Sequence, residues 1–188
     1  MEHQHYRQQQ LRDLTDSIGV YALCDLDEVP IYVGQSTDGI RSRVRRHLTS
    51  ARSDVIANRQ IDVWEVAFVW AWPVPRSDVD TVEAKLFHDF DTASKLMNGE
   101  VPNHPTEEVK IPDRVTVRVL PEAEQSRRKE PRYRFPRQAQ QVASLLDYIL
   151  EVNDKSHLRR SLHAHFERLH RYYRSFQGDL MQTFDGTS

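Results

Sequence analysis

Two short extended segments, separated by a turn, constrain the fold of this chain more than any other feature. Residues 19–26 are rich in apolar and β-favouring side chains, residues 25–30 supply turn-forming Asp and Pro, and residues 31–34 resume the extended pattern. Because only a turn separates the segments, they are expected to pair as neighbouring strands. Each carries one tyrosine, Tyr21 and Tyr32, so pairing would bring two phenols together.

A basic amphipathic helix is predicted over residues 38–52, directly after these strands. Thr37 or Asp38 can cap it, and its apolar residues recur at the spacing of one helix face. Arg43 and His47 are four residues apart, so they lie on one side of the helix. The helix also carries Arg41, Arg45, Arg46 and Arg52. A solvated face is the usual reading of such a charge run, although a guanidinium can also donate two parallel hydrogen bonds to a phosphate.

The order of these residues resembles the GIY-YIG nuclease family. The signature stands as Gly19-Val20-Tyr21, ten residues, Tyr32-Val33-Gly34, then Gln35-Ser36, and then Arg43-x-x-x-His47. The family also has a glutamate on a later helix, followed by an asparagine. Glu83 and Asn98 match that order, with Asn103 as the alternative asparagine. The resemblance covers about residues 18–105.

The resemblance implies a metal-dependent endonuclease that hydrolyses phosphodiester bonds of DNA, with RNA as an open alternative. Glu83 is then the ligand of one Mg²⁺ or Mn²⁺ ion per active site, since magnesium can bind through one carboxylate and keep most of its waters. Arg43 would hold the scissile phosphate, with Arg41, Arg45 and Arg46 binding the nucleic acid around it. Asn98 would orient the site from the side.

Three residues compete for the role of general base. By resemblance, Tyr21 is the residue nearest the attacking water, with Tyr32 and His47 around it. A free phenol has a pKa of about 10, so a tyrosine base needs nearby cations, and Arg43 is placed to be one. His47 is the alternative acceptor because imidazole titrates near neutral pH.

The predicted fold class is α+β, with a small mixed or antiparallel sheet flanked by helices and followed by a C-terminal helical hairpin. Residues 61–72 read as a central strand covered on both faces, residues 78–97 as a helix, and residues 114–120 as a half-exposed strand. Trp70 is assigned to the core, with base stacking as the alternative, and for Trp72 the two readings stay open.

The expected organisation has five parts. These are an N-terminal extension at residues 1–17, a nuclease domain at 18–110, a strand and basic linker at 111–137, a helical hairpin at 138–176 and a flexible tail at 177–188. In the linker, arginines alternate with Tyr133 and Phe135, a pattern that suits either a plain connection or nucleic-acid contact. The hairpin has apolar faces that dock on the nuclease core or pair with a second chain, which makes a homodimer an open possibility. Its second helix is read as having a solvated or DNA-facing basic side, with Arg159, Arg160, Arg168, Arg171 and Arg174.

Composition limits the remaining function classes. The single cysteine, Cys24, excludes an intrachain disulfide and a cysteine zinc site, and it fits a reducing, cytoplasmic location. No apolar run is long enough for a membrane span. The formal charge of −2 does not itself favour nucleic-acid binding, but the basic residues are unevenly distributed.

Within the nuclease class, a restriction or defence role is expected by analogy, with a repair or structure-specific nuclease as the alternative. Two readings from other classes are an inactive nucleic-acid-binding module and a helical interaction protein that carries the signature by chance.

Overall fold

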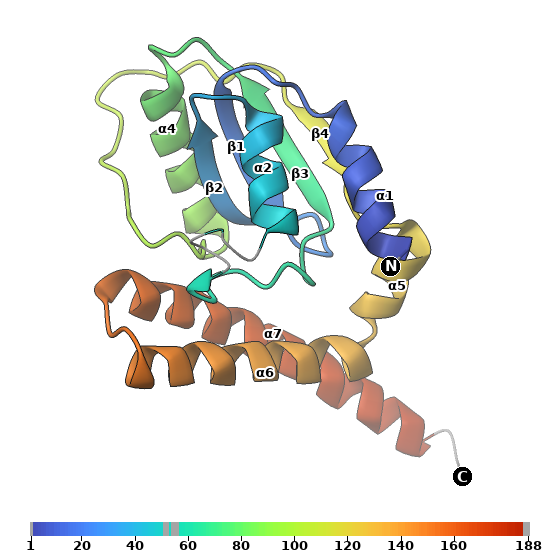
Figure 1. Ribbon diagram of the computed structural model, residues 1–188. Helices are drawn as coiled ribbons and strands as arrows, with labels where there is room; N and C mark the ends of the chain where they lie inside the picture. Colours follow the sequence, from blue (N-terminus) through green and yellow to red (C-terminus); the bar gives the residue numbers. More distant parts are fainter. Residues whose placement is uncertain (1, 51–52, 54–56, 186–188) are drawn as a thin grey trace.

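The computed structural model describes residues 2–50, 53 and 57–185. Its centre is a four-stranded antiparallel sheet in the order β2-β1-β3-β4 (Figure 1). The strands are β1 (Gly19–Cys24), β2 (Pro30–Ser36), β3 (Phe68–Pro73) and β4 (Val115–Arg118). The helices are α1 (Glu2–Gln10), the 3₁₀ turn η1 (Leu11–Asp13), α2 (Ile40–Thr49), α4 (Val79–Ala93), α5 (Glu122–Lys129), α6 (Pro131–Glu151) and α7 (Ser156–Asp185). The α+β fold class predicted from sequence is confirmed.

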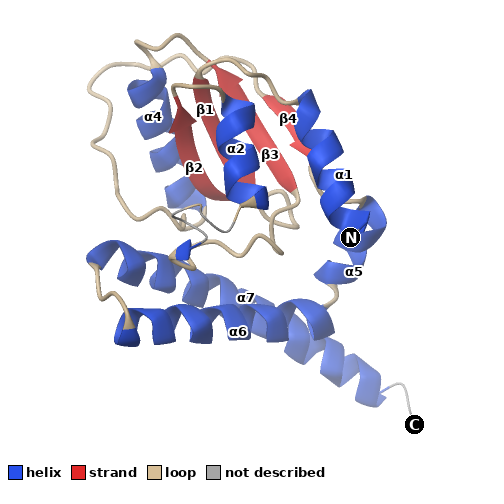
Figure 2. Cartoon of the chain, in the orientation of Figure 1, coloured by secondary structure: helices blue, strands red, loops and turns tan. Residues whose placement is uncertain are grey.

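Alternate residues of β1 supply two cores, one on each face of the sheet. Tyr21 and Leu23 pack on the α2 side, and Val20 and Ala22 pack on the α4 side. This is the period of two that a strand imposes. Both helices are visible against the sheet in Figure 2, with β2 as the edge strand. Trp72 is buried on the α4 side, as is Trp70, so both tryptophans belong to the core.

Three predicted boundaries were wrong for local reasons. The strand placed at residues 61–72 begins only at Phe68, because the Asp62 carboxylate accepts a hydrogen bond from the Trp64 N–H (3.1 Å) and holds residues 62–66 in turns. Helix α2 begins after Gly39, since Asp38 accepts the Ser36 hydroxyl (2.9 Å) instead of capping the helix. Helix α4 ends at Ala93 rather than at residue 97.

The N-terminal residues form a helix that packs on the domain. Leu11 and Leu14, which follow α1, are buried in the core on the α2 side. Arg7 is also buried and donates to the carbonyls of Val63 (3.3 Å) and Val66 (3.4 Å). The segment expected to be a loose or partly helical extension is therefore joined to the sheet layer.

The segment read as a basic linker at residues 111–137 contains helix α5 and the first turns of α6. Its arginines are occupied within the protein: Arg128 donates to Glu124 (2.7 Å) and to the Trp64 carbonyl (2.6 Å). Arg134, buried like Arg128, pairs with Glu65. The alternative that these residues contact nucleic acid is excluded for Arg128 and Arg134, because both guanidinium groups are buried and paired within the protein.

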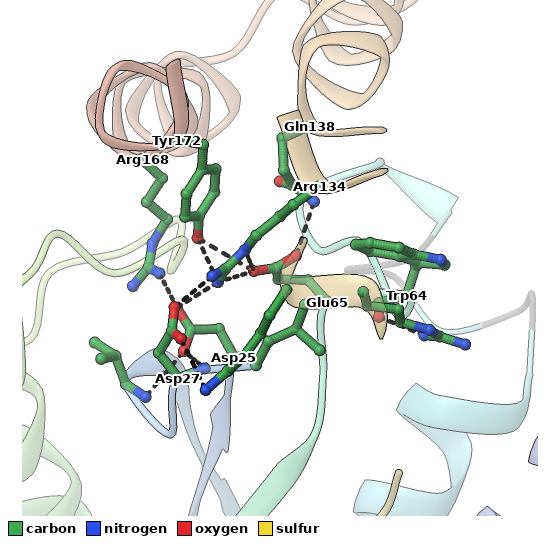
Figure 3. A network of polar contacts seen from close by, with 12 residues as sticks. Asp25, Asp27, Trp64, Glu65, Arg134, Gln138, Arg168 and Tyr172 are labelled. Atoms are coloured by element: carbon green, nitrogen blue, oxygen red, sulfur yellow. Dashed lines mark hydrogen bonds and ion pairs between the residues drawn. The ribbon is translucent and has the colours of Figure 1, made fainter. Parts of the chain in front are cut away.

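Helices α6 and α7 form the predicted antiparallel hairpin, and it docks on the sheet layer. Figure 3 shows arginines of the hairpin reaching carboxylates of the sheet layer. Arg168 of α7 donates to Asp25 (2.6 Å), and Arg134 of α6 donates to Glu65 (2.8 Å). The Tyr172 hydroxyl also donates to Glu65 (3.2 Å). The prediction of a solvated or DNA-facing basic side is wrong for Arg168, which is only 1% exposed.

Candidate active site

The phenol of Tyr21 and the imidazole of His47 form a buried pair between β1 and α2. Tyr21 Oη lies 2.7 Å from His47 Nε2, and His47 Nδ1 lies 2.5 Å from Ser53 Oγ. All three residues are buried. In the tautomer in which Tyr21 donates to Nε2, the Nδ1–H donates to Ser53, so the imidazole is held at both nitrogens.

Gly34 of β2 makes room for the tyrosines. It pairs with Tyr21 across the strands, and a Cβ atom at this position would lie 2.6 Å from Tyr21 Oη and 2.8 Å from a ring carbon of Tyr32. The Tyr32 ring is centred 6.3 Å from that of Tyr21 and 5.9 Å from that of His47. The absence of a side chain at residue 34 therefore allows three rings to gather there.

Arg43 acts on the same phenol. Burial raises the pKa of Tyr21 well above its usual value, and Tyr32 adds to the rise. The charge of Arg43 and its hydrogen bond to Tyr21 oppose this shift, while Glu83 adds to it slightly. The arginine thus meets the requirement for a cation beside the phenol, but burial dominates and keeps the resting phenol neutral.

Glu83 approaches from α4, on the other face of the sheet. The Gln35 amide donates to Glu83 Oε2 and to Asp80 Oδ1, both at 2.9 Å. Burial raises the pKa of Glu83 to about 7, the nearby Asp80 carboxylate contributes to the rise, and the Gln35 hydrogen bond opposes it. A half-buried carboxylate with a raised pKa and an amide as its hydrogen-bond partner is a group that a bound cation would stabilise.

Asn98 is fixed to the open edge of β2. Its amide donates to the Val33 carbonyl (2.6 Å), and its carbonyl accepts from the Val33 N–H (3.0 Å). Asn103, the alternative, is exposed and lines a separate hollow beside Asp80. The structure therefore places Asn98, and not Asn103, next to Tyr32.

A pocket of about 380 Å³ joins these parts. It is lined by Tyr32, Gln60, Glu83, Phe87, Asn98, Gly99, Glu100, Val101, Pro102 and His157. Of the residues predicted for the site, Tyr32, Glu83 and Asn98 contact this pocket. Tyr21 and His47 do not line it, and both are almost completely excluded from solvent, but their rings are centred 6.3 and 5.9 Å from that of Tyr32.

The arginines predicted to bind nucleic acid differ in their surroundings. Arg41 donates to the Leu14 carbonyl (2.7 Å) and pairs with Asp16 (2.6 Å), so it also fastens the N-terminal segment. Arg46 is exposed and lies 3.8 Å from Asp38, and Arg45 is exposed. Arg52 lies outside the described residues.

Comparison with protein families decides what kind of domain holds this site. Residues 17–97 match the family model described as the GIY-YIG catalytic domain. The chain contains a GIY-YIG catalytic domain. The searches of curated proteins and of solved structures returned no significant match. The GIY-YIG match implies a nuclease, and hence a nucleic-acid substrate.

The GIY-YIG match ends at Met97, one residue before Asn98. Two residues near the site received no role from the sequence. Gln35 belongs to the quoted signature, directly after Tyr32-Val33-Gly34, so its position was a usable signal. His157 begins α7, about 60 residues beyond the GIY-YIG segment, and no sequence pattern connects it to the pocket.

GIY-YIG nucleases generally depend on a divalent metal, and Glu83 fits one. Among the described residues there is no group of three or more His, Cys, Asp and Glu arranged to hold a metal ion. A single carboxylate is compatible with magnesium, which usually keeps several waters, and is a poor match to the multi-ligand sites of zinc.

Within the described part of the chain, no helix has the length and apolar character of a membrane span.

Proposed function

We propose that this chain is a divalent-metal-dependent endonuclease that hydrolyses phosphodiester bonds of DNA. The observation that carries the proposal is the shared pocket of Glu83, Tyr32 and Asn98, together with the ring contacts of Tyr32 with the buried Tyr21–His47 pair. A carboxylate for a metal, a phenol for a water and a nearby cation are groups that suit phosphodiester hydrolysis.

Each residue has a distinct role in this proposal. Glu83 would hold Mg²⁺ or Mn²⁺, which when bound supplies positive charge to the scissile phosphate. Gln35 orients the Glu83 carboxylate by its hydrogen bond. Asn98 fixes the rim of the pocket to the edge of β2. Arg43 contributes positive charge near the reacting groups.

The three candidate bases have different access to the pocket. Tyr32 lines it, whereas Tyr21 is fully buried and its pKa is raised. We therefore assign contact with the attacking water to Tyr32. Tyr21 and His47, whose rings contact that of Tyr32, would hold Tyr32 in position. If Tyr21 is the base instead, Tyr21→Phe lowers the rate in a single turnover at least as much as Tyr32→Phe.

The central test is cleavage of supercoiled plasmid DNA with magnesium. Glu83→Gln is expected to lower the rate by about 100-fold or more, because the metal loses its carboxylate. Glu100→Gln is the matched control, since Glu100 lines the same pocket but is exposed, and should cleave like the wild type. Equal cleavage by Glu83→Gln and wild type would refute the proposal.

The finer assignments rest on the same assay. Discrete fragments indicate a restriction or defence enzyme, whereas nicks or structure-dependent cuts indicate a repair-type nuclease. A folded chain that binds DNA but never cleaves it is the inactive binding module. Cleavage of RNA instead of DNA would change the substrate class.

A homodimer and a cytoplasmic location remain predictions. Exposed apolar side chains on the hairpin, such as Leu150 and Phe166, are available for a second chain. A molecular mass that stays monomeric over a wide concentration range, with and without DNA, would exclude the dimer.

A further inference from the structure

Helix α7 contributes a wall of the candidate active-site pocket, although it lies outside the GIY-YIG segment. His157, in its first turn, lines the pocket together with Glu83 and Asn98. The contact is close, because a Cβ atom on Gly99 would lie 2.7 Å from His157 Cβ. His157 is half-buried, so part of the imidazole remains accessible.

Strong hydrogen bonds hold this turn of α7 against the loop that carries Asn98. Arg160 donates to the carbonyls of Leu96 (2.7 Å) and Asn98 (3.0 Å), and to the Asp91 carboxylate (2.5 Å). Ser161 donates to the Met97 carbonyl (2.8 Å). Since the anchor is one turn away from His157, these bonds hold the backbone that carries the imidazole close to Asn98.

The charge of the pocket wall singles out His157. Two carboxylates, Glu83 and Glu100, face the pocket. Of the described residues that line it, His157 is the one that can carry a positive charge. A nucleic-acid strand carries several consecutive phosphates. A metal held by Glu83 would neutralise the charge of only one of them, so a second phosphate that enters the pocket next to Asn98 needs a hydrogen-bond donor among the side chains of the pocket wall.

We propose that His157 is a substrate-contacting residue, which donates a hydrogen bond to a backbone phosphate of the bound strand adjacent to the scissile one. The inference rests on the proposed nuclease function and adds to it a substrate contact from outside the GIY-YIG segment. The hairpin would thus help bind the strand as well as support the sheet.

The test is binding of a fluorescein-labelled DNA duplex in EDTA, which prevents cleavage, measured at several salt concentrations. His157→Ala is expected to weaken binding about tenfold, since a hydrogen bond to a charged phosphate is lost. The slope of log K against log salt should become less steep by about 1, the value for one phosphate contact. His157→Lys keeps a cationic donor and should restore both quantities.

His163→Ala is the matched control, because His163 lies on the same helix, is exposed and faces Glu167 (3.1 Å). It should leave binding and its salt dependence unchanged. An unchanged salt slope in His157→Ala, or a loss that His157→Lys does not restore, would overturn the phosphate contact. Thermal unfolding of each variant identifies a loss that comes only from folding.

Failure of this inference differs from failure of the proposed function. If the wild type cleaves plasmid and Glu83→Gln does not, while His157→Ala binds and cleaves like the wild type, only the His157 assignment fails. If the wild type neither binds the duplex nor cleaves plasmid, the proposed function fails and the inference falls with it.

Discussion

At the scale of single residues, the site depends on one position that has no side chain. A methyl group on Gly34 would overlap the hydroxyl of Tyr21 and the ring of Tyr32. The Tyr21 ring is completely buried, so it cannot simply move away, whereas the Tyr32 ring could be displaced only towards the pocket that it lines. The tyrosine motif therefore includes its glycine for steric reasons.

Gly34→Ala is expected to lower plasmid cleavage by about tenfold or more, because the displaced tyrosine rings are no longer in the position that the reaction requires. Gly178→Ala provides the control: nothing lies within 4 Å of a Cβ atom there, and alanine is the better helix former. Cleavage rates of both variants, with far-UV circular dichroism to check folding, test the prediction. A fully active Gly34→Ala variant would contradict it.

His165 gives the protein a pH-dependent stability. Burial lowers the pKa of His165 to about 4, and its Nε2–H donates to the Gln60 carbonyl (2.9 Å). Below pH 6.5 the His165 imidazole takes up a proton in the unfolded chain but stays neutral in the folded chain. The free energy of unfolding therefore falls as the pH drops towards 4. The contribution lost by pH 4.5 is about 2–3 kcal/mol.

Urea denaturation at pH 7 and pH 4.5 measures this loss. His165→Gln keeps a donor for Gln60 but cannot be protonated, so its decline in stability should be smaller than that of the wild type. His163→Gln, at an exposed position, should decline like the wild type. Identical declines in all three proteins would show that His165 does not titrate in this way.

The candidate-site residues were selected by resemblance, and local pattern predicted the proximity of those that are near one another along the chain. Strand pairing brings Tyr21 and Tyr32 together, and helix periodicity does so for Arg43 and His47. The place of Asn98 is explained only by its contact with Val33 in the structure. The access of each group to the pocket was not predictable, because it depends on packing between distant segments.

At the scale of elements, the docking of the hairpin shows how a local charge pattern misleads. Arginines on an amphipathic helix usually face solvent or nucleic acid. Here Arg168 meets Asp25, which lies 143 residues earlier in the chain. The sequence around each residue contains no sign of the other. The two helices could therefore be predicted from the sequence, but the surface on which they dock could not.

Arg168→Leu is expected to destabilise the protein by about 3 kcal/mol or more, because it leaves the buried Asp25 carboxylate without its closest cation. Arg159→Leu removes an exposed pair with Asp154 and should have little effect. Urea denaturation compares the two variants. Equal stability losses would mean that the Asp25 contact does not hold the hairpin.

At the scale of the whole molecule, sheet layer and hairpin are expected to unfold as one cooperative unit. The chain has three tryptophans, all between residues 64 and 72, so their fluorescence reports on the sheet layer. Far-UV circular dichroism is dominated by helix, much of it in α6 and α7. Because Asp25 and Glu65 join both parts through buried ion pairs, loss of either should expose the other.

Urea transitions followed by the two signals should therefore coincide. A fragment of residues 1–120 should lack a cooperative transition and should not cleave plasmid. Loss of helicity at lower urea than the change in fluorescence, or an active fragment, would show that the hairpin is an independent domain.

The hydrogen bonds from Arg160 and Ser161 to the loop around Asn98 have a consequence for biosynthesis. A ribosome releases the strands, α2, Glu83 and Asn98 well before it releases the first turn of α7, and the part of a chain made first generally folds first. A nascent chain would therefore possess the Glu83 carboxylate before the wall of its pocket is in place. On the proposed function, the pocket would be complete for cleavage only after the first turn of α7 has emerged and docked.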